Sequence, residues 1–182
     1  MNKKLVLATL FFLSVFAISA QEARYEVKSA IIKKTTEMMG LKSETVQYID
    51  DYGAKEAIIT DGSHTIIKEN MRINISSESK TGVKRALPKN RINFMKLTPE
   101  MIEENELKEE SREEFAGKIC IKYTMAMNVM GRKVTSTVWV WKGVPIKTIV
   151  SEIGYTELVT EIQENVAINA EVFLVPDDVT IQ

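Results

Sequence analysis

The sequence has little of what builds most catalytic or metal sites. Its 182 residues include one cysteine, Cys120, and one histidine, His64. A single cysteine excludes an intramolecular disulfide, and the common zinc sites need more of these two residue types than the chain has. No HExxH motif, phosphate-binding glycine loop or nucleophile elbow occurs. We therefore expect no metal, no cofactor and no enzymatic activity.

The chain also lacks an excess of positive or negative charge. The chain has 24 basic and 25 acidic residues, for a net charge of -1. This balance gives no electrostatic reason to expect binding to nucleic acid or to an anionic membrane surface. The densest charge is the acidic run from Glu103 to Glu114, which we expect to be a solvated surface stretch, part helix and part edge strand.

Long apolar runs are absent except at the start of the chain. There Lys3 and Lys4 precede the apolar run Leu5 to Ala17, and small residues follow as far as Ala20. This order predicts a signal peptide at residues 1–20, cleavage after Ala20 and a periplasmic protein. Without a second long apolar run, no transmembrane segment is expected in the mature chain. Residues 21–182 are expected to form a single domain.

Most of this domain alternates between apolar and polar residues, which is typical of β-strands. Turn-like stretches such as "DDYG", "DGSH" and "SKTG" separate the strands, and short connections favour antiparallel neighbours in a meander. The predicted strands are Tyr25 to Thr35, Glu44 to Asp51, Ala54 to Thr60, His64 to Lys68, Met71 to Ser76, Val83 to Leu87, Lys118 to Asn128, Lys133 to Lys142, Pro145 to Ile153, Tyr155 to Ile168 and Glu171 to Val175.

One short helix interrupts the strands. Thr98 is a suitable N-cap and Pro99 suits the first helical position, so a helix from about Pro99 to Asn105 is predicted. Cys120 falls inside an apolar strand pattern, so we expect a small buried side chain rather than a reactive thiol.

Strict alternation along strands predicts which side chains share a face. A two-residue turn at either Gly131-Arg132 or Met130-Gly131 puts Tyr123, Met125 and Met127 on the same face as Val138 and Val140. Extending the alternation through the reversals near Gly143 and Gly154 gives a wide apolar inner face. Its predicted ligand-binding residues are Ile119, Ile121, Tyr123, Met125, Met127, Val138, Val140, Ile149, Leu158 and Ile162.

The stretch "VTSTVWVWKG" also places apolar residues on the opposite face. Trp139 and Trp141 lie there with Ile146, on a side that is otherwise polar. Such an apolar island needs either a covering segment of the chain or a protein partner. The three residues are therefore a candidate partner surface.

An antiparallel sheet with a wide apolar face and one short helix can hide that face in three ways. It can close into a barrel, fold into a sandwich, or curl around a lid and leave a cavity. A solid core and a ligand cavity both remain open at this point, because Met and branched aliphatic residues suit either.

Several segments together resemble periplasmic proteins of the outer-membrane lipoprotein carrier family. They are "YEVKSAIIKK", "YIDDYGAKEA", "SKTG", "LTPEMI", "FAGKICIKY", "VWVWKGVPIK" and "VAINAEVFLVPDDV". The resemblance implies a mainly β fold, a curved antiparallel meander that forms an unclosed half-barrel with a short helix packed on its concave side. It also implies an apolar cavity, since carriers of that type hold the acyl chains of lipoproteins.

Two functions follow as hypotheses. The first is a non-enzymatic periplasmic carrier that shelters an apolar ligand, a lipid or lipoprotein acyl chain, against the inner face. The alternative is a cell-envelope protein-protein interaction module with a solid core and no small ligand, in which Trp139, Trp141 and Ile146 dock a partner.

Overall fold

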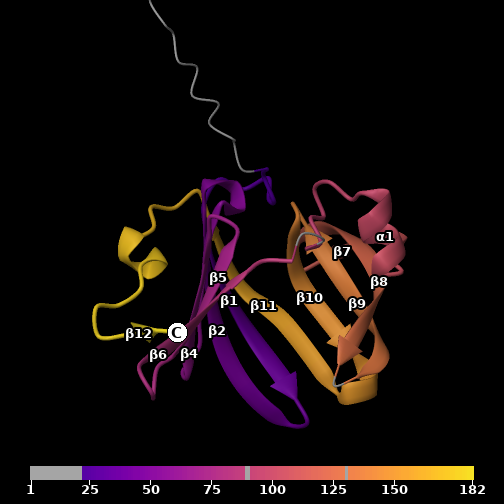
Figure 1. Ribbon diagram of the computed structural model, residues 1–182. Coiled ribbons are helices and arrows are strands. Elements are labelled where there is room, and N and C mark those ends of the chain that lie inside the picture. Colours follow the sequence, from indigo (N-terminus) through magenta and orange to yellow (C-terminus); the bar gives the residue numbers. More distant parts are fainter. Residues whose placement is uncertain (1–21, 89–90, 130) are drawn as a thin grey trace, which may run out of the picture.

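The computed structural model describes residues 22–88, 91–129 and 131–182. The predicted signal peptide at residues 1–20 lies outside them. The described chain forms one open sheet of 12 strands in the order β12-β6-β5-β4-β3-β2-β1-β11-β10-β9-β8-β7 (Figure 1). All neighbours are antiparallel except β12 and β6, which are parallel. The predicted mainly β fold with an unclosed sheet is thus confirmed.

The strands are β1 (Ala30–Met38), β2 (Leu41–Asp50), β3 (Lys55–Ile59), β4 (Ser63–Lys68), β5 (Met71–Ser76), β6 (Thr81–Ala86), β7 (Lys108–Phe115), β8 (Lys118–Val129), β9 (Arg132–Trp141), β10 (Val144–Val150), β11 (Tyr155–Glu164) and β12 (Thr180–Ile181). The helices are α1 (Pro99–Glu104) and the short 3-10 turns η1 (Asp51–Gly53), η2 (Ser151–Ile153) and η3 (Ala170–Phe173).

Most predicted elements are present with small changes at their ends. Thr98 caps α1 as predicted, because its side chain accepts a hydrogen bond from the Met101 amide. The acidic run continues from α1 into β7, which lies at one edge of the sheet. The strand predicted at Glu171 to Val175 was wrong, because the Asn169 side chain accepts from the Glu171 amide and starts the turn η3 instead.

The turn at the tip of the β1–β2 hairpin contains a residue that is unfavourable for its backbone conformation. Met38 pairs with Leu41, so Met39 and Gly40 form the turn, and both have positive φ (53° and 80°). Two-residue turns of this kind favour Asn-Gly, because a left-handed backbone is costly for most side chains. Met39 is also 81% exposed, so its side chain gains little from packing.

Replacing Met39 with Asn is therefore expected to raise the free energy of unfolding by about 0.5 to 1 kcal/mol. Urea denaturation of the two proteins measures the difference. An unchanged or lower stability would show that the Met39 side chain makes a stabilising contact that offsets its backbone strain.

The β8–β9 hairpin follows one of the two predicted turns. Val129 pairs with Arg132, Tyr123 with Val138 and Met127 with Val134. The predicted grouping of Tyr123, Met125, Met127, Val138 and Val140 on one face is confirmed, because pairing partners in a sheet share a face.

Two irregularities shift the alternation further along. A bulge in β10 lies between Pro145 and Lys147, and the β1–β11 pairing shifts between Lys33 and Lys34. Beyond the first bulge, Lys147 pairs with Trp139 and Ile149 with Thr137. An extra residue moves all later side chains to the other face.

As a result, part of the predicted inner face was wrong. Ile149 shares the Trp139 face, and so does Leu158, which pairs with Lys147. The second shift restores the alternation, so Ile162, which pairs with Ile32, lies on the same face as Lys34 and Val138, as predicted.

We call the face that carries Tyr123 and Val138 the inner face. Strand pairing continues it across the sheet through Thr148, Glu157, Thr36, Lys34, Gln47, Ile58 and Glu56. The chain after β6 crosses to α1 beside this sheet (Figure 1). We call residues 91–97 the crossing segment.

The crossing segment covers the inner face of β8 and β9. Ile92, Phe94 and Leu97 pack against a buried cluster that contains Tyr123, Val138, Val140 and Leu107. The Phe94 and Tyr123 rings lie 5.3 Å apart between centroids. The helix α1 itself has no buried residue, so the cover comes from the residues that flank it.

Trp139 and Trp141 belong to the main hydrophobic core. They are each 8% exposed and Ile146 is 2% exposed. Their cluster includes Tyr25, Val27, Ala30, Ile32, Ile49, Cys120 and Val144. Of the two alternatives left open for this apolar island, the structure shows the first, because the chain itself covers these side chains.

Lysine side chains complete the cover over the two tryptophans. Lys118 Nζ lies 3.9 Å from the centroid of the Trp141 ring, and Lys147 Nζ lies 4.3 Å from that of Trp139. Such cation–π contacts let the alkyl stem shield the ring while the ammonium stays hydrated. The Trp139 indole NH donates to Glu113 on β7.

Cys120 is fully buried in this core and unpaired, as predicted. Burial raises the pKa of its thiol above the ordinary value, which disfavours the reactive thiolate.

The C-terminal residues cover the opposite face of β4 and β5. Val175 and Val179 pack on the buried Ile66, Ile73 and Ile75, and His64 bonds the Val172 carbonyl through Nε2 at 2.9 Å. His64 is thus a structural residue in the described fold.

Candidate functional site

Two adjoining cavities lie beside the crossing segment, and the first of them lies between this segment and the inner face. Their volumes are about 530 and 540 Å³, and both are lined by Arg24, Pro88 and Arg91. This is within the usual range for small-molecule sites. We call them the sheet cavity, which Glu56 and Thr148 also line, and the outer cavity, which Met71 and Met101 also line.

A buried carboxylate lies at the wall of the sheet cavity. Glu56 is 1% exposed and pairs across the sheet with Ile49 on one side and Ile67 on the other, both buried. A carboxylate in such surroundings needs charged and hydrogen-bonding partners. The structure supplies them from three separate parts of the chain.

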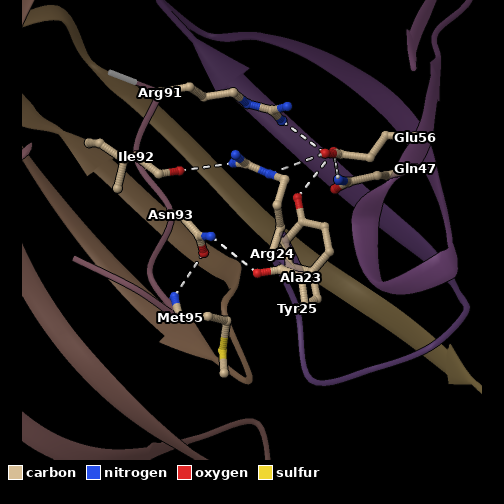
Figure 2. Close-up of polar contacts among 9 residues, drawn as sticks. All are labelled: Ala23, Arg24, Tyr25, Gln47, Glu56, Arg91, Ile92, Asn93 and Met95. Carbon is tan, nitrogen blue, oxygen red and sulfur yellow. Dashed lines mark hydrogen bonds and ion pairs between the residues drawn. The ribbon is translucent and has the colours of Figure 1, made fainter. Parts of the chain in front are cut away.

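Two arginines approach the same oxygen of Glu56 (Figure 2). An Nη atom of Arg91 lies 2.9 Å from Oε1, and Arg24 Nε lies 3.5 Å from it. The other oxygen, Oε2, accepts hydrogen bonds from Tyr25 at 3.1 Å and Gln47 at 3.2 Å. We call these five residues the Glu56 centre.

The Glu56 centre also joins the N-terminal segment to the crossing segment. Arg24 donates to the Ile92 carbonyl at 2.8 Å, and the Asn93 amide donates to the Ala23 carbonyl at 3.1 Å (Figure 2). Asn93 in turn accepts from the Met95 amide. These hydrogen bonds fix the crossing segment to residues 23 and 24, next to the sheet cavity.

Burial and the neighbouring Glu56 carboxylate raise the pKa of the Tyr25 hydroxyl well above its ordinary value. Tyr25 therefore keeps its proton and remains a donor to Glu56.

A second ion pair also lines the sheet cavity, on the same inner face as Glu56. Lys34 Nζ and Glu157 Oε1 are 3.0 Å apart, and Lys34 is buried. Ile58, Ile92, Phe94 and Pro145 add apolar contacts to the lining, and Gln47, Asn105 and Thr148 add polar groups. The cavity is thus amphipathic, with a smaller apolar part beside a polar and charged part.

The ten predicted ligand-binding residues lie elsewhere. None of them is among the described residues that line the two cavities. Tyr123, Val138 and Val140 are buried beneath the crossing segment, with Ile121 and Met125 packed beside them. Ile119 is 68% exposed, and Met127 is also exposed. A role of these residues in ligand binding stays a prediction.

Sequence reasoning missed the Glu56 centre. Glu56 did leave a signal, because alternation in the strand "KEAII" places its carboxylate on the same face as the apolar Ile58. Its partners Arg24 and Arg91 come from segments outside the sheet, where alternation says nothing about side-chain direction.

Among the described residues, no group of three His, Cys, Asp or Glu side chains is placed to hold a metal ion. No helix in the described part of the chain is both long and apolar enough to cross a membrane.

Comparison with known proteins finds similarity in structure alone. No family model matches the chain, and no curated protein matches its sequence. An uncharacterized conserved protein from Thermus thermophilus superposes with a TM-score of 0.59 at 10% identity, over 86% of this chain and 91% of that one.

MucB in the Pseudomonas aeruginosa MucA/MucB complex is also similar. It superposes with a TM-score of 0.56 at 14% identity, and the match covers 86% of this chain but 58% of that chain. An outer membrane lipoprotein-sorting protein domain from Vibrio parahaemolyticus gives a TM-score of 0.43 at 10% identity, over 83% and 92% of the two chains. That last value does not establish the carrier family, so the chain shares its fold with the first two structures and its family stays a prediction.

Proposed function

We propose that this protein is a non-enzymatic, extracytoplasmic binding protein that shelters the apolar chain of a lipid-like ligand. The observation that carries the proposal is the sheet cavity of about 530 Å³ between the inner face and the crossing segment. Ile58, Ile92, Phe94 and Pro145 offer apolar contact there. Each methylene that leaves water for such a wall contributes about 0.8 kcal/mol.

The location in the periplasm rests on the expected signal peptide.

MucB, with which the chain shares its fold, was solved in a complex with MucA. A protein-binding role is therefore the second candidate. Strand β7 favours it, because it is exposed and pairs only with β8, which leaves one backbone edge open in the described sheet.

Native mass spectrometry of the exported protein tests the binding proposal. We expect an added mass that organic extraction removes, and lipid analysis of the extract should identify it. Replacing Ile58 with Trp should fill the cavity and remove the added mass, whereas Ile119→Trp on the exposed end of β8 should keep it. Protein that is empty by both methods would contradict the proposal and favour the protein-binding role.

A further inference from the structure

The Glu56 centre carries more positive than negative charge. Two guanidinium groups face one carboxylate, and all three are largely withdrawn from water, with side-chain exposures of 16% for Arg24, 26% for Arg91 and 1% for Glu56. Lys34 and Glu157, which also line the sheet cavity, balance each other. A charge that is partly desolvated and not neutralised is costly, so an anion that binds there is stabilised.

One buried N–H donor in the Glu56 centre has no hydrogen-bond partner. Arg24 Nε is buried and makes no hydrogen bond to any described residue, although it lies 3.5 Å from Glu56 Oε1. Arg24 is fixed in place by its bond to the Ile92 carbonyl. Its guanidinium is therefore held in position, and its Nε faces Glu56 without a hydrogen bond that would neutralise the pair more fully.

The two arginines lie where the cavities adjoin. Both guanidinium side chains line the sheet cavity and the outer cavity. A charged group that binds between them is within reach of the apolar wall formed by Ile58, Ile92 and Phe94. Guanidinium groups match the geometry of carboxylate and phosphate oxygens and stay charged at all relevant pH values.

We infer that the ligand is an anionic amphiphile whose carboxylate or phosphate group binds Arg24 and Arg91 while its alkyl chain lies in the sheet cavity. This inference rests on the proposed binding function and specifies the head group. Glu56 holds the two arginines in place when no ligand is bound and competes with the ligand's negative charge when it arrives.

The test measures the affinity of the full mature chain for three probes of equal chain length: laurate, dodecyl phosphate and dodecanol. We expect laurate or dodecyl phosphate to bind at least about tenfold more tightly than dodecanol, which corresponds to one good charge-assisted hydrogen bond. Whichever of the two anions binds more tightly shows whether the site prefers a carboxylate or a phosphate. Added salt should weaken anion binding and leave dodecanol binding unchanged.

Variants separate charge from structure. Arg91→Gln should weaken anion binding about tenfold and change dodecanol binding less than twofold, whereas Glu56→Gln should tighten anion binding. Both changes break the same ion pair, so opposite effects on anion affinity cannot come from lost stability alone. Arg112→Gln on the exposed β7 strand is the matched control and should change neither affinity.

Equal affinity of wild-type protein for laurate, dodecyl phosphate and dodecanol would overturn the inference and leave the binding function intact. The inference would also be overturned if Arg91→Gln lowered the affinity for all three probes equally. If none of the three probes binds to the wild-type chain, the proposed function itself fails. The salt dependence needs no variant, so it tests the inference even where a substitution prevents folding.

Discussion

Replacing Glu56 with Gln is expected to lower the free energy of unfolding by about 3 kcal/mol. The substitution keeps the shape of the side chain but leaves Arg24 and Arg91 without their counter-ion in a largely buried place. Removing one partner of a buried ion pair costs more than the pair itself contributes, because the remaining charge stays desolvated. Urea denaturation followed by tryptophan fluorescence measures the change.

The matched control is Glu37→Gln. Glu37 pairs with Lys42 at 3.6 Å near the hairpin tip, where both side chains are exposed to solvent. Exposed pairs contribute about 0 to 1 kcal/mol, so this variant should stay close to the wild type. If Glu56→Gln were as stable as Glu37→Gln, the carboxylate would have no structural role and the arginines would be held by other contacts.

Replacing Trp141 with Ala is expected to lower the free energy of unfolding by about 3 to 5 kcal/mol. The ring lies in the main core with Ile32, Ile49 and Val144, and Lys118 covers its outer face. The substitution removes a large apolar side chain and leaves a cavity that the surrounding strands cannot fully close. Thermal or urea unfolding reports the loss.

This result also decides between the two interpretations of the tryptophan pair. A partner surface would tolerate Trp141→Ala with little loss of stability, as the exposed Ile119→Ala control should, within about 0.5 kcal/mol. A stable Trp141→Ala protein would restore the docking hypothesis, whereas a strongly destabilised one shows that the pair is structural.

Much of the fold could be predicted because its signals are local. Met71–Ser76 has the predicted bounds, and the other strands of the meander differ from the predicted ones mainly at their ends. Thr98 and Pro99 marked the start of α1 for the same reason, since a cap acts within one helical turn. Short turns between alternating strands were enough to predict antiparallel neighbours.

The face assignment failed where a bulge interrupts the period. The extra residue at Ile146 in β10 leaves the composition of the strand unchanged, so Ile149 and Leu158 still looked like inner-face residues. Only the pairing of β10 with β9 shows on which side they lie.

By itself, the sequence determined most of the strands, the short helix and the antiparallel meander, because each depends on neighbours within a few residues, and the apolar strand pattern around Cys120 indicated its burial. The tertiary structure alone decided the rest. It brings β1 beside β11, it covers Trp139 and Trp141 with lysines from other strands, and it gathers the Glu56 centre from segments far apart in the chain. A buried charge is stable only with partners at contact distance, and which residues reach that distance is a property of the folded chain.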